Sequence, residues 1–540
     1  MTTRSAIRAR SFGSLWHTMC AGVFLLAAIG AGAPAAAPAP APAGADVLTF
    51  HGDFARTGWD ANESTLTPDS IRAGRFGKLW TAPVQGEIYA EPLVVSGVAA
   101  GGGAPRTVIY TVTERDLVYA LDAATGRVVW GPVSVGQPVP RASLPCGNID
   151  PVGITSTPVV DRAASTLYLV GLTTPDGGRT KVYKAAALDL ASGRMRPGWP
   201  VTIAPPASDG RQFVATAQHQ RAALGLAHGV LYVPFGGYFG DCGQYYGWVI
   251  GVPAGDPGHQ QSFAVPTQRM GAIWAAGGVA LDAAGNLYAS TGNSESGSAV
   301  DFGDAVIRLQ TEPTLRFSRA TRDYFVPSNF VALNAGDVDL GSAAPLLLPP
   351  QPGLVPHLIF IAGKQGVGYL INADDMGGLS KGNGVTGEGV YSRCVFGSCR
   401  GGRPEVFSAA AYWDGGSAGR FIVVPGHGSQ PAPCRGTGGV AALKLGAAGG
   451  AGFDVAWCSG SMSNAGAPAV SSAGASGGLV WVVDSAEGVL YALNAATGAA
   501  VYASSGPDLL GSAHQFITPA IAAGRVYVGA GHTVAAYGLK

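Results

Sequence analysis

Charge is scarce in this sequence of 540 residues, and neither sign is in excess. Charged residues make up 13% of the chain, and 34 Lys and Arg residues balance 34 Asp and Glu residues, so the formal net charge is zero. Binding to a nucleic-acid backbone needs a positively charged face, and this composition supplies no basic excess for one. We therefore expect no nucleic-acid partner.

Long apolar runs are also missing beyond the N-terminal 45 residues, so no membrane span is expected in the mature chain. What the sequence does have is glycine and proline, at 82 and 37 residues, together with a hydrophobic fraction of 47%. That fraction excludes disorder, and the frequent turn residues favour many short strands.

The first 45 residues have the pattern of an export signal. Three arginines precede an apolar stretch at 21–29, which is followed by small residues and by an Ala-Pro tract that ends at Ala45. We expect cleavage between Ala33 and Ala45 and a periplasmic or secreted mature protein of residues 46–540. An uncleaved anchor is the alternative, although the apolar stretch is short for a bilayer.

Removing the signal takes Cys20 with it and leaves six cysteines. An even number in an exported chain favours disulfides, and six cysteines allow fifteen pairings. We expect Cys394 to pair with Cys399, and Cys434 with Cys458, because both pairs close local loops.

A unit of two short apolar strands around a polar turn recurs along the mature chain. Its first copy is VIYTVTERDLVYALDAATGRVVW, and the mean spacing between copies is about 60 residues. The central residues of the first strand in the eight copies are Tyr110, Tyr168, Tyr232, Tyr288, Phe360, Val423, Trp481 and Tyr527.

A strand rich in small residues precedes each copy, for example AEPLVV and STPVVD. Strands that converge on a central axis leave room only for small side chains, so the pattern predicts an all-β fold: an eight-bladed β-propeller of four-stranded antiparallel blades. A β-solenoid is the competitor, but its repeats are much shorter. We expect residues 47–82 to supply the outer strand of the last blade, so that the N- and C-terminal segments pair.

Polar residues in the loops that enter the inner strands are the candidate site, because ligands approach a propeller at the end of its channel. They are Glu87, Asp150, Gln218, His219, Trp274, Asp337, Asp339, Arg403, Glu405, Asn464, His514 and Gln515. The paired acids Asp337 and Asp339 are ligands for a hard cation or a source of a base, and Lys364 suits an anionic ligand. The structural alternative for each is a solvated turn residue.

One known catalytic motif occurs in the wrong context, and a haem-attachment motif is absent. Residues 474–478 fit the GxSxG pattern but lie between two expected strands, so no nucleophile is expected there. The chain has no CxxCH motif, so we expect no covalently attached haem.

The blade pattern YALDAATGRVVW resembles the repeat of the quinoprotein propellers, which include PQQ-dependent alcohol dehydrogenases and non-enzymatic scaffold propellers of the bacterial outer membrane. The segments FHGDFARTGWDANESTLTPDSI, NLYASTGNSES and AGKQGVGYL are more closely similar to a set of secreted bacterial PQQ-like repeat proteins.

The resemblance to the enzymes implies roles for four residues. Trp274 matches the aromatic floor under the quinone, and Lys364 matches the cation that contacts it. Asn293 matches a calcium ligand, and Asp339 falls where the dehydrogenases place their catalytic base, beside the same calcium.

The sequence also departs from the enzymes. Gly236-Gly237-Tyr238 stands where the enzymes have a glutamate ligand after a Gly-rich turn, and the adjacent-cysteine disulfide is missing. Asp241 is the candidate replacement for the lost carboxylate. Fewer carboxylates lower the affinity for a hard cation.

Two functions remain open at this point. The first is an exported propeller with a degenerate quinoprotein site that binds a small molecule or an envelope protein. The second is a dehydrogenase that uses PQQ and calcium to oxidise an alcohol or a sugar. The second requires Trp274, Asn293, Asp339 and Lys364 to converge on one channel mouth. The Gly-rich insertion at 372–403 either covers the channel or decorates it.

Overall fold

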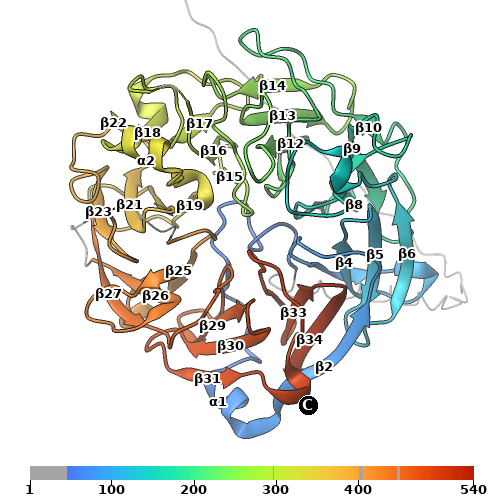
Figure 1. Cartoon of the computed structure of the whole chain (residues 1–540). Coiled ribbons are helices and arrows are strands. Elements are labelled where there is room, and N and C mark those ends of the chain that lie inside the picture. Colours follow the sequence, from blue (N-terminus) through green and yellow to red (C-terminus); the bar gives the residue numbers. More distant parts are fainter. Residues whose placement is uncertain (1–45, 296, 401–404, 447–450) are drawn as a thin grey trace, which may run out of the picture. The chain divides into compact units, whose positions relative to one another are not determined.

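The computed structural model describes residues 46–295, 297–400, 405–446 and 451–540. Their strands form eight separate sheets, each with four antiparallel strands, and two of the sheets gain a fifth, parallel strand. The sheets stand side by side in a ring around a central axis (Figure 1). The predicted eight-bladed β-propeller is confirmed.

Blades 1 to 4 follow one another along the chain, each from an inner to an outer strand. Blade 1 contains β3 (Leu93–Val98), β4 (Arg106–Val112), β5 (Leu117–Asp122) and β6 (Val128–Ser134), and blade 2 contains β7 (Val159–Asp161), β8 (Thr166–Thr173), β9 (Val182–Asp189) and β10 (Val201–Thr202). Blade 3 contains β11 (Gly225–Ala227), β12 (Val230–Phe235), β13 (Trp248–Pro253) and β14 (Gln261–Ala264), and blade 4 contains β15 (Ala280–Leu281), β16 (Leu287–Ser290), β17 (Val306–Leu309), β18 (Tyr324–Val326) and β22 (Gly378–Leu379).

Blades 5 to 8 complete the ring. Blade 5 contains β19 (Leu346–Leu347), β20 (Leu358–Ala362), β21 (Val367–Asn372) and β23 (Tyr391–Cys394), and blade 6 contains β24 (Ala411–Asp414), β25 (Arg420–Ser429), β26 (Thr437–Leu445) and β27 (Phe453–Cys458). Blade 7 contains β1 (Trp59–Asp60), β28 (Ala469–Ala473), β29 (Ser476–Asp484), β30 (Val489–Asn494) and β31 (Ala500–Ala503), and blade 8 contains β32 (Ala520–Ala522), β33 (Arg525–Ala530), β34 (Thr533–Leu539) and β2 (Phe76–Pro83).

Helical segments are short and lie in the connections. They are α1 (Pro68–Ser70), η1 (Ile71–Arg75), η2 (Ala100–Gly102), η3 (Arg141–Ser143), η4 (Thr321–Asp323), α2 (Phe330–Gly336), η5 (Leu340–Ser342), η6 (Gly416–Ala418) and η7 (Gly506–Asp508). No helix within the described ranges is long and apolar enough to cross a membrane.

The outer strand of blade 8 comes from residues that precede blade 1. β2 pairs antiparallel with β34, in a register that runs from Phe76 opposite Leu539 to Pro83 opposite Thr533. This is the strand that the sequence predicts from residues 47–82.

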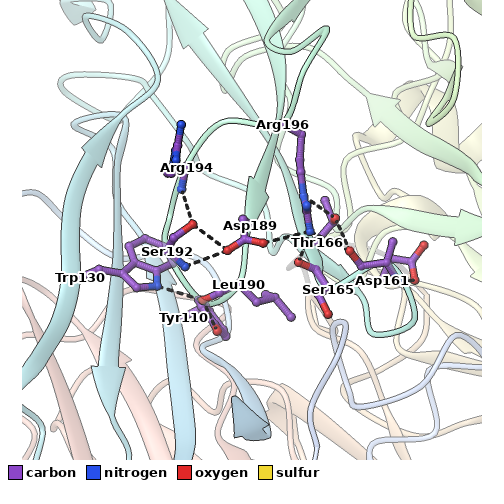
Figure 2. A network of polar contacts seen from close by, with 11 residues as sticks. Tyr110, Trp130, Asp161, Ser165, Thr166, Asp189, Leu190, Ser192, Arg194 and Arg196 are labelled. Atoms are coloured by element: carbon purple, nitrogen blue, oxygen red, sulfur yellow. Dashed lines mark hydrogen bonds and ion pairs between the residues drawn. The ribbon is translucent and has the colours of Figure 1, made fainter. Parts of the chain in front are cut away.

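Aromatic side chains of outer strands join neighbouring blades, and Figure 2 shows one such junction. Trp130 of blade 1 donates its indole N–H to the carbonyl of Leu190 in blade 2 at 2.9 Å. The turn after Leu190 is held by the Asp189 carboxylate, which accepts the N–H and the hydroxyl of Ser192. A Cβ at Gly193, where φ is +68°, would lie 2.7 Å from the Trp130 ring, so this junction requires glycine.

A segment ahead of the first blade crosses the centre of the ring (Figure 1). We call residues 47–63 the axial strap. Its backbone carbonyls accept N–H groups from the inner-strand residues of six blades, namely Val94, Val160, Leu281, Leu347, Tyr412 and Val470. In blade 8, the carboxylate of Glu63 accepts the N–H of Gly524 at 2.8 Å. The strap therefore satisfies polar groups that the inner strands would otherwise leave open at the axis.

Arg56 ties the strap to blades 3 and 4. Its side chain is 1% exposed and makes four hydrogen bonds. It donates to the carbonyl of Leu224 in blade 3 and to that of Val279 in blade 4, both at 2.9 Å. The remaining bonds go to the Thr49 hydroxyl and the Phe50 carbonyl within the strap.

Six cysteines form three disulfides. Cys394–Cys399 and Cys434–Cys458 confirm the two predicted pairs, and Cys146 bonds to Cys242 across a separation of 96 residues.

The remaining features of the sequence also have a place in the fold. The Gly-rich insertion at 372–403 is described up to residue 400. It contributes β22, which pairs with β18 of blade 4, and β23, which is the outer strand of blade 5. The GxSxG match lies in the hairpin between β28 and β29, as expected, and not at a strand-to-helix turn. The predicted export signal, residues 1–45, lies outside the described residues.

Candidate functional site

The four residues singled out by the resemblance line one cavity. Trp274, Asn293, Asp339 and Lys364 contribute to the wall of a cavity of 320 Å³, which we call the Trp274 cavity. Trp274 precedes β15 and Asn293 follows β16, both in blade 4, while Asp339 precedes β19 and Lys364 follows β20, both in blade 5. Loops of two adjacent blades therefore bring together residues that span 90 positions of the sequence.

Asp339 is the centre of the polar cluster in this wall. One carboxylate oxygen, Oδ2, accepts the indole N–H of Trp274 at 3.1 Å and lies 2.9 Å from the ammonium of Lys364. The other oxygen, Oδ1, accepts the backbone N–H of Asn293 at 3.0 Å. The Asp339 side chain is 6% exposed. Both of its oxygens are thus held by donors from the protein.

Lys364 is shared between two carboxylates. Its Nζ lies 2.8 Å from the Asp337 Oδ1 and also donates to the Asp337 backbone carbonyl at 3.2 Å. Burial disfavours the charged ammonium, but Asp339 and Asp337 outweigh this effect and hold the pKa of Lys364 above its usual value. The ammonium therefore stays protonated at neutral pH and is neutralised by its own neighbours.

A further acid lies beneath the cluster. Asp304 is completely buried and accepts the backbone N–H of Leu340 at 2.8 Å. Burial, reinforced by repulsion from Asp339, raises the pKa of Asp304 well above its usual value. The neutral form of this carboxyl is therefore favoured over its charged form.

The loop at 237–241 forms another part of the wall. Tyr238 lines the cavity, and its ring stacks on His219 with centroids 5.1 Å apart. Asp241 accepts the Tyr245 hydroxyl, and its pKa is raised, mainly by burial. The Cys146–Cys242 disulfide fastens the end of this loop.

The donors in the cavity differ from those that calcium requires. Calcium takes six to eight oxygen ligands, several of them from carboxylates. In the part of the chain that the structure describes, no three His, Cys, Asp or Glu side chains are grouped to hold a metal. The assignment of Asn293 and Asp339 to calcium stays a prediction, and the residues present do not fit the ion as a complete ligand set.

The opposite side of the cavity holds residues that the sequence analysis missed. Arg221, Phe407 and Phe516 lie in the loops that precede the inner strands of blades 3, 6 and 8. Arg221 follows His219 by two positions, so the same loop rule would have found it, whereas the two phenylalanines look like ordinary core residues. The edge of Phe516 faces Trp274 at a centroid distance of 6.3 Å.

Some of the polar loop residues that the sequence offers as candidates line the Trp274 cavity, and others do not. His219, Trp274, Asp337, Asp339 and Gln515 line the Trp274 cavity, and Arg403 lies outside the described residues. The others do not line it: they are Glu87, Asp150, Gln218, Glu405, Asn464 and His514.

Comparisons with protein-family models and with curated proteins found no match. Solved structures do match. The chain is similar to the quinohemoprotein alcohol dehydrogenase from Comamonas testosteroni, with 15% identity, a TM-score of 0.58, and coverage of 92% of this chain and 80% of that chain. It is also similar to the quinohemoprotein alcohol dehydrogenase ADHIIG from Pseudomonas putida HK5, with 16% identity, a TM-score of 0.61 and the same coverage. At these identities the likeness shows a shared propeller fold.

Proposed function

We propose that this chain is an exported propeller that binds a small molecule in the Trp274 cavity without using calcium. The cavity has the features of a small-molecule site: a volume of 320 Å³, aromatic walls from Trp274, Phe407 and Phe516, and a few convergent polar groups. A protein partner in the cell envelope remains the other candidate ligand of this face.

The observation that carries the proposal is the bonding of Asp339. Its two carboxylate oxygens accept from Trp274, Asn293 and Lys364, so the carboxylate is part of the cavity wall. A calcium ion or a catalytic proton transfer would have to compete with these donors for the oxygens, and displacing Lys364 would leave its ammonium with Asp337 alone.

Export is supported by two independent features. The N-terminal 45 residues have the composition of a signal peptide. Three disulfides bind all six cysteines of the described chain, and such bonds persist in oxidising compartments outside the cytosol.

A PQQ- and calcium-dependent dehydrogenase is the second candidate, and one observation favours it. Trp274, Asn293, Asp339 and Lys364 line the same cavity, as the resemblance to the enzymes requires. PQQ would supply the hydride acceptor for oxidation of an alcohol or sugar. The incomplete calcium ligand set argues against this candidate, so we assign no catalytic step to Asp339.

Binding of small ring compounds tests the first proposal. We would titrate benzoate, phenylacetate, indole-3-acetate and nicotinate, and the primary amide of each, into the mature protein and follow the shift in thermal unfolding. Saturable shifts are expected for at least one pair. Trp274→Ala should weaken that binding by about tenfold through loss of the ring contact.

The matched control is Trp199→Ala. Trp199 lies just before β10, the outer strand of blade 2, and it is not part of the cavity wall. This variant should bind the probes as the wild type does. Absence of binding by every probe, or an equal loss in both variants, would contradict the proposal.

A further inference from the structure

Two arginines near the axis are in opposite situations. Arg56 makes four hydrogen bonds and is satisfied within the fold. Arg221 lies in the wall of the Trp274 cavity, and the described residues offer its guanidinium no hydrogen bond and no ion pair. Its guanidinium carbon lies over the Phe516 ring, 5.2 Å from the ring centroid. A guanidinium carries five N–H donors and stays charged, so Arg221 presents unused donors to the cavity.

The surroundings of Arg221 supply no full counter-charge. Glu114 acts on it through space, but burial raises the pKa of Glu114 to about 7, so this acid is only partly ionised at neutral pH. Burial keeps His219 neutral by lowering its pKa well below the usual value, and the Arg221 charge adds to that effect. Arg221 is partly buried. A partly buried cation without an ion pair is costly, and an anionic ligand relieves that cost.

Arg221 lies next to the axial strap, because it also lines a second, smaller cavity together with Phe50 of the strap and Tyr89. Phe516 contacts both Arg221 and Trp274. A ligand that binds Arg221 in the Trp274 cavity therefore has aromatic side chains beside it, and a flat ring suits these surroundings.

The charged side chains of the cavity wall favour an anion with a single negative charge. Lys364 is already neutralised by Asp337 and Asp339, which leaves Arg221 as the cation without an ion pair among the described residues of the cavity wall. A phosphate group carries about two negative charges at neutral pH and would face the acids Asp241, Asp337 and Asp339. A carboxylate carries one charge and matches the planar fork of a guanidinium.

We propose that Arg221 anchors the carboxylate of a small, ring-containing ligand, whose ring lies beside Phe516 and Trp274. This inference rests on the proposed small-molecule binding and adds the chemical class of the ligand. It makes Arg221 a binding residue that determines specificity for acids over their neutral analogues.

Binding of the four acid–amide pairs to the wild-type protein, to Arg221→Met and to Arg127→Met tests this inference. Arg127 is an exposed arginine in the turn before β6, so its replacement controls for the loss of one positive charge. In the wild type, the acids should bind about tenfold or more tightly than their amides, the gain expected from a charge-assisted bidentate contact. Arg221→Met should abolish this preference, and Arg127→Met should retain it. Phenyl phosphate should bind no more tightly than benzoate.

Stability of the ligand-free protein gives an independent measurement. Because Arg221 makes no hydrogen bond, Arg221→Met should leave the thermal midpoint unchanged or raise it. A lower midpoint would assign Arg221 a structural role and overturn the inference. Equal binding of acids and amides, or a preference that survives in Arg221→Met, would also overturn it while leaving the proposed function in place. If no probe binds the wild type, the proposed function itself fails, and this inference with it.

Discussion

The carboxylate of Asp339 accepts the indole N–H of Trp274 at 3.1 Å, across the junction between blades 5 and 4. The same oxygen lies 2.9 Å from the Lys364 ammonium. One acid thereby fixes the orientation of the aromatic wall and neutralises the cation beside it. This bond defines the candidate site more closely than the fold does, because the fold alone supports many functions.

Replacing Asp339 by asparagine should destabilise the protein. The amide keeps an acceptor for Trp274 but leaves the buried Lys364 ammonium with Asp337 as its remaining carboxylate, at a cost of about 2 kcal/mol. Urea denaturation measures the change. Asp374→Asn is the control, because Asp374 forms an exposed ion pair with His357 and its loss should cost about 0.5 kcal/mol or less. Equal effects of the two variants would contradict the role assigned to Asp339.

Replacing Arg56 by methionine should be among the most damaging changes in the strap. Four hydrogen bonds disappear, and buried carbonyls of blades 3 and 4 lose a donor. We expect a loss of about 3–5 kcal/mol in the free energy of unfolding. Arg221→Met is a useful comparison, since it removes a partly buried guanidinium that makes no hydrogen bond. A loss for Arg56→Met as small as that for Arg127→Met would show that the strap does not hold the blades together.

The pH dependence of stability should report on Glu91. This buried acid accepts the backbone N–H of His51 in the strap at 2.9 Å, and burial raises its pKa from 4.5 to about 8. Because the folded pKa lies above the unfolded value, the protonated acid stabilises the fold fully below pH 4.5, and this contribution is lost as the pH rises through about 8.

Buried His51, whose pKa burial lowers from 6.5 to about 3, makes the free energy of unfolding rise with pH up to about 6.5. The contribution of Glu91 should instead fall between about pH 5 and pH 8, and Glu91→Gln should remove this fall. Burial raises the pKa of Glu114 to about 7 and that of Asp60 to about 6, which acts in the same direction, so part of the slope should remain. Urea titrations at both ends of this range test the prediction. An unchanged slope in Glu91→Gln would mean that Glu91 is ionised in the folded protein.

The disulfides should differ in their contributions to stability. Cys146–Cys242 closes a loop of 96 residues, whereas Cys394–Cys399 closes one of five. In the chain-entropy account, replacing the first pair by serine should cost about 4–5 kcal/mol and replacing the second about 2 kcal/mol. The first replacement should also weaken ligand binding, because it frees the loop that carries Asp241. Calorimetry measures the free energy of unfolding of the two double variants. An equal loss of stability in both would contradict this difference between the disulfides.

Most of the fold follows from local sequence patterns. The small-residue inner strands and the aromatic second strands lie where the repeats predict them, because these strands of each blade come from about 60 consecutive residues. The outer strand β2 comes from the other end of the chain and follows from the strand that the last repeat lacks. The axial strap does not follow in this way. Its partners are backbone N–H groups of inner strands, and such contacts leave no side-chain pattern. The charged residues Arg56 and Glu63, both buried in the structure, mark it.

The candidate site could be predicted from the sequence only in part. Resemblance placed Trp274, Asn293, Asp339 and Lys364, and the structure brings them to one cavity. Their mutual bonds depend on how blades 4 and 5 pack, which no single segment encodes. The position of Arg221, two residues after His219, could have been found by the same loop rule, but its lack of an ion pair exists only in three dimensions.

The most direct test of the account is calorimetric titration of PQQ into the mature protein with and without calcium. The account predicts that any heat of binding is the same in both conditions, because the oxygens of Asp339 are held by Trp274, Asn293 and Lys364. Asp339→Ala and Asn293→Ala, with folding checked by circular dichroism, are the companion variants. Saturable binding that requires calcium and is weakened by both changes would contradict the account and establish the dehydrogenase-type site.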